Sequence, residues 1–203
     1  MVTMATNDGQ IREALMAALV CRLEKYRKKT GHPTRIIQEL GLCNGKNRVD
    51  IATVNGILHG YEIKSDLDTL ERLPRQLEEY DKVFDKMTLV VGEKHIISAL
   101  EIIPDWWGVE LAKIDVNGVV NFSEIREASK NPSQESRAIA KLLWRQEALA
   151  LLSKSNNEKI TGRSSREKIY GHLIELFSRD ELLEVVRTIL ISRQDWKAGS
   201  SQM

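Results

Sequence analysis

Two β-rich runs joined by Asn55-Gly56 constrain this fold more than any other part of the sequence. The runs cover residues 48–54 and 57–64. An Asn-Gly pair between two such runs is the strongest short signal for a β-hairpin. The first run carries Asp50, and the second carries Glu62 and Lys64. Because side chains alternate along a strand, Glu62 and Lys64 lie on the same face of the predicted sheet.

The position of Asp50 sets a condition on the turn. A plain two-residue turn at Asn55-Gly56 would place Asp50 opposite Tyr61, on the face away from Glu62. A shift of one residue in the pairing would bring Asp50 onto the Glu62 face. We therefore predict a three-residue turn, or a β-bulge at Gly56 or Gly60.

Two carboxylates and one lysine on a common face suit a hard divalent cation. Oxygen ligands favour Mg²⁺ over Zn²⁺, with Mn²⁺ as a substitute, and no Cys or His stands nearby at metal-ligand spacing. We expect Asp50, Glu62 and the backbone carbonyl of Ile63 to bind the cation, which would activate a water for attack on a phosphate. Lys64 would orient that water or stabilise charge in the transition state. The pattern predicts a metal-dependent nuclease with Asp50, Glu62 and Lys64 as catalytic residues.

The rest of the chain predicts an α/β core followed by helices. Helical periodicity runs from Asp8, the expected N-cap, to about residue 29. The other expected elements are a loop-rich connection at 31–47, a helix at 69–84, a strand at 87–91 and a hairpin at 109–115 and 119–122. A helix at 135–152 follows, and capping-box spacings of Ser164 with Glu167 and Ser178 with Glu181 predict two more. We therefore divide the chain into a core at 1–122 and a C-terminal helical extension at 123–203.

Composition limits the function less sharply. The formal net charge of the 203 residues is +1, so nucleic-acid binding cannot be argued from bulk charge and any basic surface must be local. The two cysteines, Cys21 and Cys43, stand in no metal or redox spacing and fit a reducing compartment. No apolar run approaches a membrane span and the N-terminus does not resemble a signal peptide. We expect a cytoplasmic protein with no membrane contact.

The hairpin residues are also similar to a known signature. Asp50, followed after eleven residues by Glu62-Ile63-Lys64, resembles the motif of the PD-(D/E)XK nuclease superfamily, although Val49 stands where the motif name has proline. Gln76 and Tyr80 resemble the QxxxY helix motif of its RecB-like branch. Residues 10–120, including Pro104-Asp-Trp-Trp-Gly108, resemble small stand-alone predicted nucleases of bacteria and their mobile elements.

This resemblance implies a restriction-endonuclease-like α/β fold, with a mixed sheet flanked by helices, and Mg²⁺-dependent cleavage of DNA. It also implies that Gln76 and Tyr80 bind substrate and that an upstream helix glutamate is a further metal ligand. Glu39 is the first choice for that ligand, and Glu13 is the competitor. RNA stays open as a substrate.

Two hypotheses from other classes stay open. The fold could serve as a catalytically silent nucleic-acid-binding module. Alternatively, the chain could be a regulatory protein whose C-terminal helices bind a protein partner or a second copy of the chain. Gln76 and Tyr80 could then simply border the apolar side of their helix. The basic stretch 154–168 could contact DNA phosphates or be a solvated linker.

Overall fold

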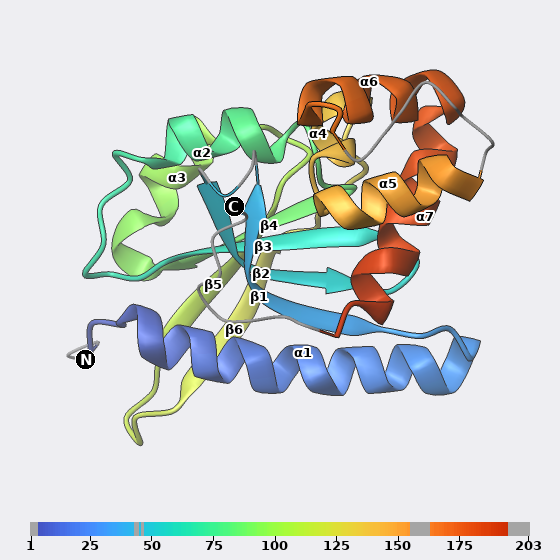
Figure 1. Cartoon of the computed structure of the whole chain (residues 1–203). Helices are drawn as coiled ribbons and strands as arrows, with labels where there is room; N and C mark the ends of the chain where they lie inside the picture. Colours follow the sequence, from blue (N-terminus) through green and yellow to red (C-terminus); the bar gives the residue numbers. More distant parts are fainter. Residues whose placement is uncertain (1–3, 43–44, 46, 155–162, 195–203) are drawn as a thin grey trace.

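The computed structural model describes residues 4–42, 45, 47–154 and 163–194, and its centre is one six-stranded sheet (Figure 1). The strands lie side by side in chain order: β1 (Arg35–Leu42), β2 (Asn47–Val54), β3 (Leu58–Lys64), β4 (Lys86–Gly92), β5 (Gly108–Ile114) and β6 (Val120–Arg126). β4 runs parallel to both β3 and β5, and the other neighbouring pairs are antiparallel. The predicted α/β class with a mixed sheet flanked by helices is confirmed.

Helix α1 (Asp8–Thr30) lies along one face of the sheet (Figure 1). Its N-cap is Asn7, which forms a capping box with Gln10, so the prediction that Asp8 is the cap is wrong by one residue. Asn and Asp are equally good caps, and the reciprocal bond from the third helical residue decides between the two positions. The buried side of α1 packs on the β3 residues Tyr61 and Ile63. Because side chains alternate along a strand, Glu62 and Lys64 of β3 point to the opposite face of the sheet.

All other helices lie on that opposite face (Figure 1). They are α2 (Leu73–Tyr80), the short η2 (Glu93–His95), α3 (Ile96–Ile102), α4 (Ser136–Ala140), α5 (Arg145–Lys154), α6 (Arg166–Leu176) and α7 (Arg179–Ser192). One continuous apolar cluster contains sheet residues such as Leu89 together with Tyr80 of α2 and Leu173 of α6. β6 also continues past residue 122 to Arg126, so the predicted boundary at 122/123 falls inside a strand.

The hairpin between β2 and β3 has the predicted three-residue turn. Val54 pairs with Leu58 and Ile51 pairs with Tyr61, which leaves residues 55–57 as the loop. Gly56 has φ = 92°, a left-handed conformation that glycine adopts without steric cost. Continuing this register by one residue brings Asp50 onto the face of Glu62, and both residues line one cavity, as the three-residue turn predicts.

Four predictions about the elements are corrected. Residues 35–42 form β1 instead of a loop-rich connection, because Glu39, at φ = 53°, breaks the alternation between buried Ile37 and Leu40 and hides the strand period. The helix predicted at 69–84 covers 73–80. The helix predicted at 135–152 is split in two, since the Glu147 carboxylate accepts a hydrogen bond from the Trp144 amide and starts a second helix there. α6 begins one residue later than expected.

The N-cap of α6 is Ser165 rather than Ser164, and it forms no capping box, whereas the box of Ser178 with Glu181 at α7 is confirmed. α3 was not predicted, because Ile97 and Leu100 are exposed and blur its apolar side. In the described part of the chain, no helix combines the length and apolar character needed to span a bilayer. Most of the loop in the basic stretch 154–168, residues 155–162, lies outside the described residues.

Candidate functional site

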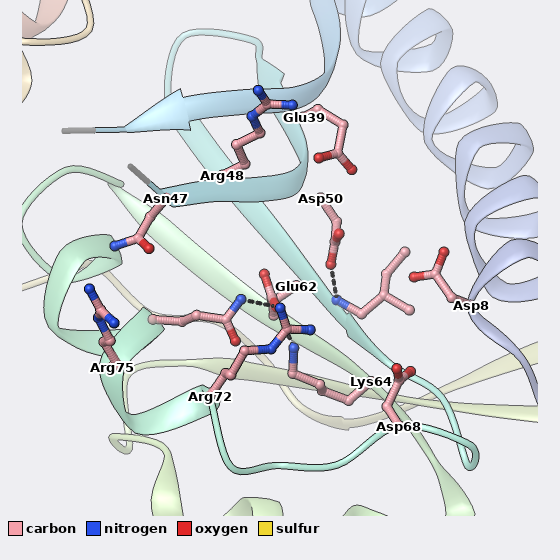
Figure 2. A pocket seen from close by; sticks show the side chains of 12 residues that line it. Asp8, Glu39, Asn47, Arg48, Asp50, Glu62, Lys64, Asp68, Arg72 and Arg75 are labelled. Carbon is pink, nitrogen blue, oxygen red and sulfur yellow. Dashed lines mark hydrogen bonds and ion pairs between the residues drawn. The ribbon is translucent and has the colours of Figure 1, made fainter. Parts of the chain in front are cut away.

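An open cavity of about 350 Å³ lies beside β2 and β3 and the start of α2 (Figure 2). The predicted catalytic and metal-binding residues all contribute to its walls. Twelve residues line it: Asp8, Glu39, Asn47, Arg48, Asp50, Glu62, Ile63, Lys64, Asp68, Arg72, Arg75 and Gln76. The hairpin register therefore brings the sequence motif together in space, at a place that is open to a ligand.

Asp50 is held in this cavity by the neighbouring strand. Its Oδ2 accepts a hydrogen bond of 2.8 Å from the backbone amide of Ile63, drawn as a dashed line in Figure 2. Its Oδ1 lies 2.7 Å from Nη2 of Arg12. The Asp50 side chain keeps 19% of its surface exposed, so it can still be reached from the cavity.

Glu62 is almost fully enclosed, with 2% of its surface exposed. Its Oε1 lies 2.6 Å from both Nζ of Lys64 and Nε2 of Gln76, and its Oε2 accepts a hydrogen bond of 2.8 Å from the hydroxyl of Tyr80. Burial, reinforced by the nearby charge of Asp50, raises the pKa of Glu62 to about 7. Near neutral pH this carboxyl group therefore exchanges between its acid and its base form.

Gln76 and Tyr80 both contact Glu62, as expected for residues one helical turn apart. The Tyr80 hydroxyl is buried and also contacts the backbone carbonyl of Arg48 at 2.7 Å. Burial and the Glu62 charge raise the pKa of Tyr80, so the phenol stays protonated and acts as a donor. These contacts fix the Glu62 side chain, while the predicted role of both residues in substrate binding stays a prediction.

The predicted helix glutamate is not on a helix. Glu39 belongs to β1, where the pairing of Gln38 with Ile51 and of Leu40 with Val49 places it opposite Asp50. Glu39 lines the cavity. The register of β1, and not a position on a helix, brings it there. The competitor Glu13 is exposed on α1 and does not line the cavity.

Arg12 was missed by sequence reasoning and is central to the site's electrostatics. Its guanidinium contacts Asp8 at 3.1 Å, Glu39 at 3.1 Å and Asp50 at 2.7 Å. Only the contact with Asp8, four residues earlier on the same helix, has a local signal in the sequence. The other two partners come from different strands, so three-dimensional structure was needed to find them.

The donor set fits Mg²⁺, although it does not form a dense acidic cage. Among the described residues, no three His, Cys, Asp or Glu side chains are grouped closely enough to hold a metal ion. Mg²⁺ needs fewer, because it usually keeps several waters and binds one or two carboxylates. Asp50 and Glu62 supply two, and the buried Oε1 of Gln76 has no hydrogen-bond partner in the described structure, so it can accept a bond from a bound water.

Comparison with known proteins identifies the family. Protein cII of Enterobacteria phage P4 is 41% identical over 69 residues, which cover 34% of this chain and 26% of that protein. The alignment thus spans about a quarter of the relative's length, and no solved structure matches the chain. Residues 7–201 match the family model described as bacteriophage P4 protein cII. Because this match covers nearly all 203 residues, the chain belongs to the bacteriophage P4 protein cII family.

Proposed function

We propose that the protein is a Mg²⁺-dependent nuclease that hydrolyses phosphodiester bonds in DNA. The observation that carries this proposal is the hairpin register, which sets Asp50 opposite Glu62 and beside Lys64 in one open cavity. The chain order of α1, three antiparallel strands, α2 and a parallel β4 supports it, since the resemblance to PD-(D/E)XK nucleases implies a mixed sheet flanked by helices. The bacteriophage family agrees with the expected mobile-element origin.

Each residue has a distinct role in this proposal. Asp50, Glu62 and the carbonyl of Ile63 would hold the cation, which when bound supplies a Lewis acid and an activated water. Gln76 and Tyr80 fix the Glu62 carboxylate from the helix side. Lys64 keeps an ammonium group beside Glu62, where it can stabilise negative charge that develops on a phosphate oxygen. Because the pKa of Glu62 is raised, the Glu62 carboxyl group can bind the cation only after it has lost its proton.

A second candidate is a nucleic-acid-binding module without catalysis. Arg12 already contacts Asp50, and Lys64 already contacts Glu62, so the chain's own cations neutralise both carboxylates. A cavity neutralised in this way can approach a polyanion without a metal ion. The alternative of a regulatory protein that binds a protein partner also stays open, and Leu176 is the one exposed large hydrophobic side chain that the described residues of α4 to α7 would offer to a partner.

The decisive experiment measures cleavage of linear duplex, single-stranded and branched DNA in Mg²⁺, Mn²⁺ or EDTA. Glu62→Gln and Lys64→Met remove the proposed functions with little change in volume, and Glu101→Gln and Lys113→Met are matched controls at exposed positions outside the cavity. Cleavage that needs the metal, fails in both site variants and persists in both controls would support the nuclease. Cleavage that survives in Glu62→Gln would contradict it, and DNA binding without cleavage would support the second candidate.

A further inference from the structure

Three arginines line the cavity, and their guanidinium groups contact no side chain among the described residues. Arg48 comes from β2, Arg72 is the N-cap of α2, and Arg75 is in the first turn of α2. All three residues are exposed. No ion pair or side-chain hydrogen bond joins their guanidinium groups to any residue in the described part of the chain, in contrast to the Arg12 and Lys64 side chains.

The three arginines, here called the arginine rim, approach the site from two directions. Figure 2 shows Arg48 on the strand side of Glu62, and Arg72 and Arg75 on the helix side. Arg72 and Arg75 are three residues apart at the start of α2, so their side chains emerge on the same side of the helix. A ligand that crosses the cavity from β2 to α2 therefore meets guanidinium groups at both ends.

The chemistry of the rim favours phosphate groups. A guanidinium presents a planar set of N–H donors that matches two phosphate oxygens at once, and it stays charged at all accessible pH values. The centre of the cavity contains Asp50 and Glu62, which repel a polyanion unless positive charge surrounds them. An anionic polymer with evenly spaced phosphates would satisfy all three arginines while its middle lies over the carboxylates.

We propose that the arginine rim binds the sugar-phosphate backbone of a DNA strand on both sides of the phosphate that lies over Asp50 and Glu62. This inference rests on the proposed nuclease function, and it adds how the substrate is recognised. Contacts to phosphates fix the position of a strand but carry no base information. The rim therefore predicts binding that is strongly salt-dependent and nearly independent of base sequence.

The test measures binding in EDTA, so that no cleavage interferes, by fluorescence anisotropy of labelled duplex and single-stranded DNA of two unrelated sequences. The variants are Arg48→Ala, Arg72→Ala, Arg75→Ala and the triple substitution. Arg179→Ala is the control, because it removes the same charge from an exposed position on α7 outside the cavity. Urea denaturation of each variant confirms that it is folded.

We expect each rim substitution to weaken binding about tenfold, the effect of losing one charge-assisted contact. The slope of log affinity against log salt concentration should fall by about 1 per arginine on duplex DNA, equally for both sequences. The control should change neither quantity by a comparable amount. In Mg²⁺, if the wild type cleaves DNA, the triple variant should raise KM with little change in kcat, because the rim binds ground state and transition state alike.

The two proposals fail in different ways. Wild-type protein that binds no DNA, or a triple variant with the affinity and salt slope of the control, would overturn the rim. DNA binding that depends on the rim, without cleavage in any metal, would overturn the nuclease and keep the rim as a binding surface. Cleavage with an unchanged KM in the triple variant would keep the nuclease and overturn the rim.

Discussion

The buried Glu62 makes the stability of the protein depend on pH in a direction opposite to that of an ordinary ion-paired carboxylate. Burial and Asp50 raise its pKa from 4.5 to about 7 in the folded state. At about 1.36 kcal/mol for each pH unit, this difference corresponds to about 3 kcal/mol. Folded protein binds the proton more tightly than unfolded protein, so the contribution is fully present below pH 4.5 and is lost as the pH rises through about 7.

The measurement is the free energy of unfolding in urea, in EDTA, at intervals between pH 4.5 and 8.5. We expect the wild type to lose up to about 3 kcal/mol of stability from this group over that range. Glu62→Gln has no proton to lose and should show a flatter profile, whereas Glu101→Gln, exposed on α3, should follow the wild type. Profiles of the same slope in Glu62→Gln and in the wild type would refute the assignment of this pH dependence to Glu62.

The same experiment in Mg²⁺ connects stability with the proposed site. A cation bound to the Glu62 carboxylate favours the ionised form, and it stabilises the folded state in proportion to its occupancy. We expect added Mg²⁺ to restore stability above about pH 7, where Glu62 is ionised, and to have little effect near pH 5. Stabilisation by Mg²⁺ that is equal at both pH values would place the cation elsewhere.

Three further predictions concern single substitutions. Tyr80→Phe removes the buried donor of Glu62 and should lower the free energy of unfolding by about 1–3 kcal/mol in a urea titration, and an unchanged midpoint would contradict this role. Arg12→Ala removes the cation that competes at Asp50, so calorimetry should show tighter Mn²⁺ binding, whereas Arg22→Ala, on the same helix but paired elsewhere, should not. Gly108→Ala places a Cβ 2.8 Å from the backbone nitrogen of Ala128 and should cost about 1–3 kcal/mol, in contrast to Gly171→Ala in α6, whose Cβ meets nothing within 4 Å.

The sequence predicted the centre of the sheet well because its signals are local. Alternation, an Asn-Gly turn and the need to bring Asp50 and Glu62 together were enough to predict the three-residue turn. The edge strand β1 was missed because Glu39 interrupts its alternation with a left-handed residue. The start of α6 was displaced by one position because two adjacent serines, Ser164 and Ser165, offer the same capping group.

The electrostatic organisation of the site was not readable from the sequence. Arg12 is 27 residues from Glu39 and 38 residues from Asp50, and no periodic pattern connects positions so far apart on different elements. The arginine rim is equally hidden, since arginines at the start of one strand and the start of one helix are ordinary surface residues until the fold brings them to one cavity. The near-zero net charge of the chain conceals both features.

The contact between Arg12 and Asp50 offers a way to distinguish the two candidate functions. In the described structure the Arg12 guanidinium occupies the side of Asp50 that faces Glu39, and the pairing is only partly exposed, so a cation must compete with a charged hydrogen bond of 2.7 Å. Removing the guanidinium frees the carboxylates of Asp8, Glu39 and Asp50 and raises the negative charge of the cavity. If the protein is a nuclease, Arg12→Ala should bind Mn²⁺ more tightly and retain DNA cleavage. In a binding module that uses no metal, the same substitution should leave three carboxylates beneath the DNA without their arginine partner and weaken DNA binding in EDTA. The nuclease therefore predicts that Arg12 weakens metal binding, and the binding module predicts that Arg12 strengthens DNA binding. Measuring Mn²⁺ binding and DNA binding in Arg12→Ala separates the two functions.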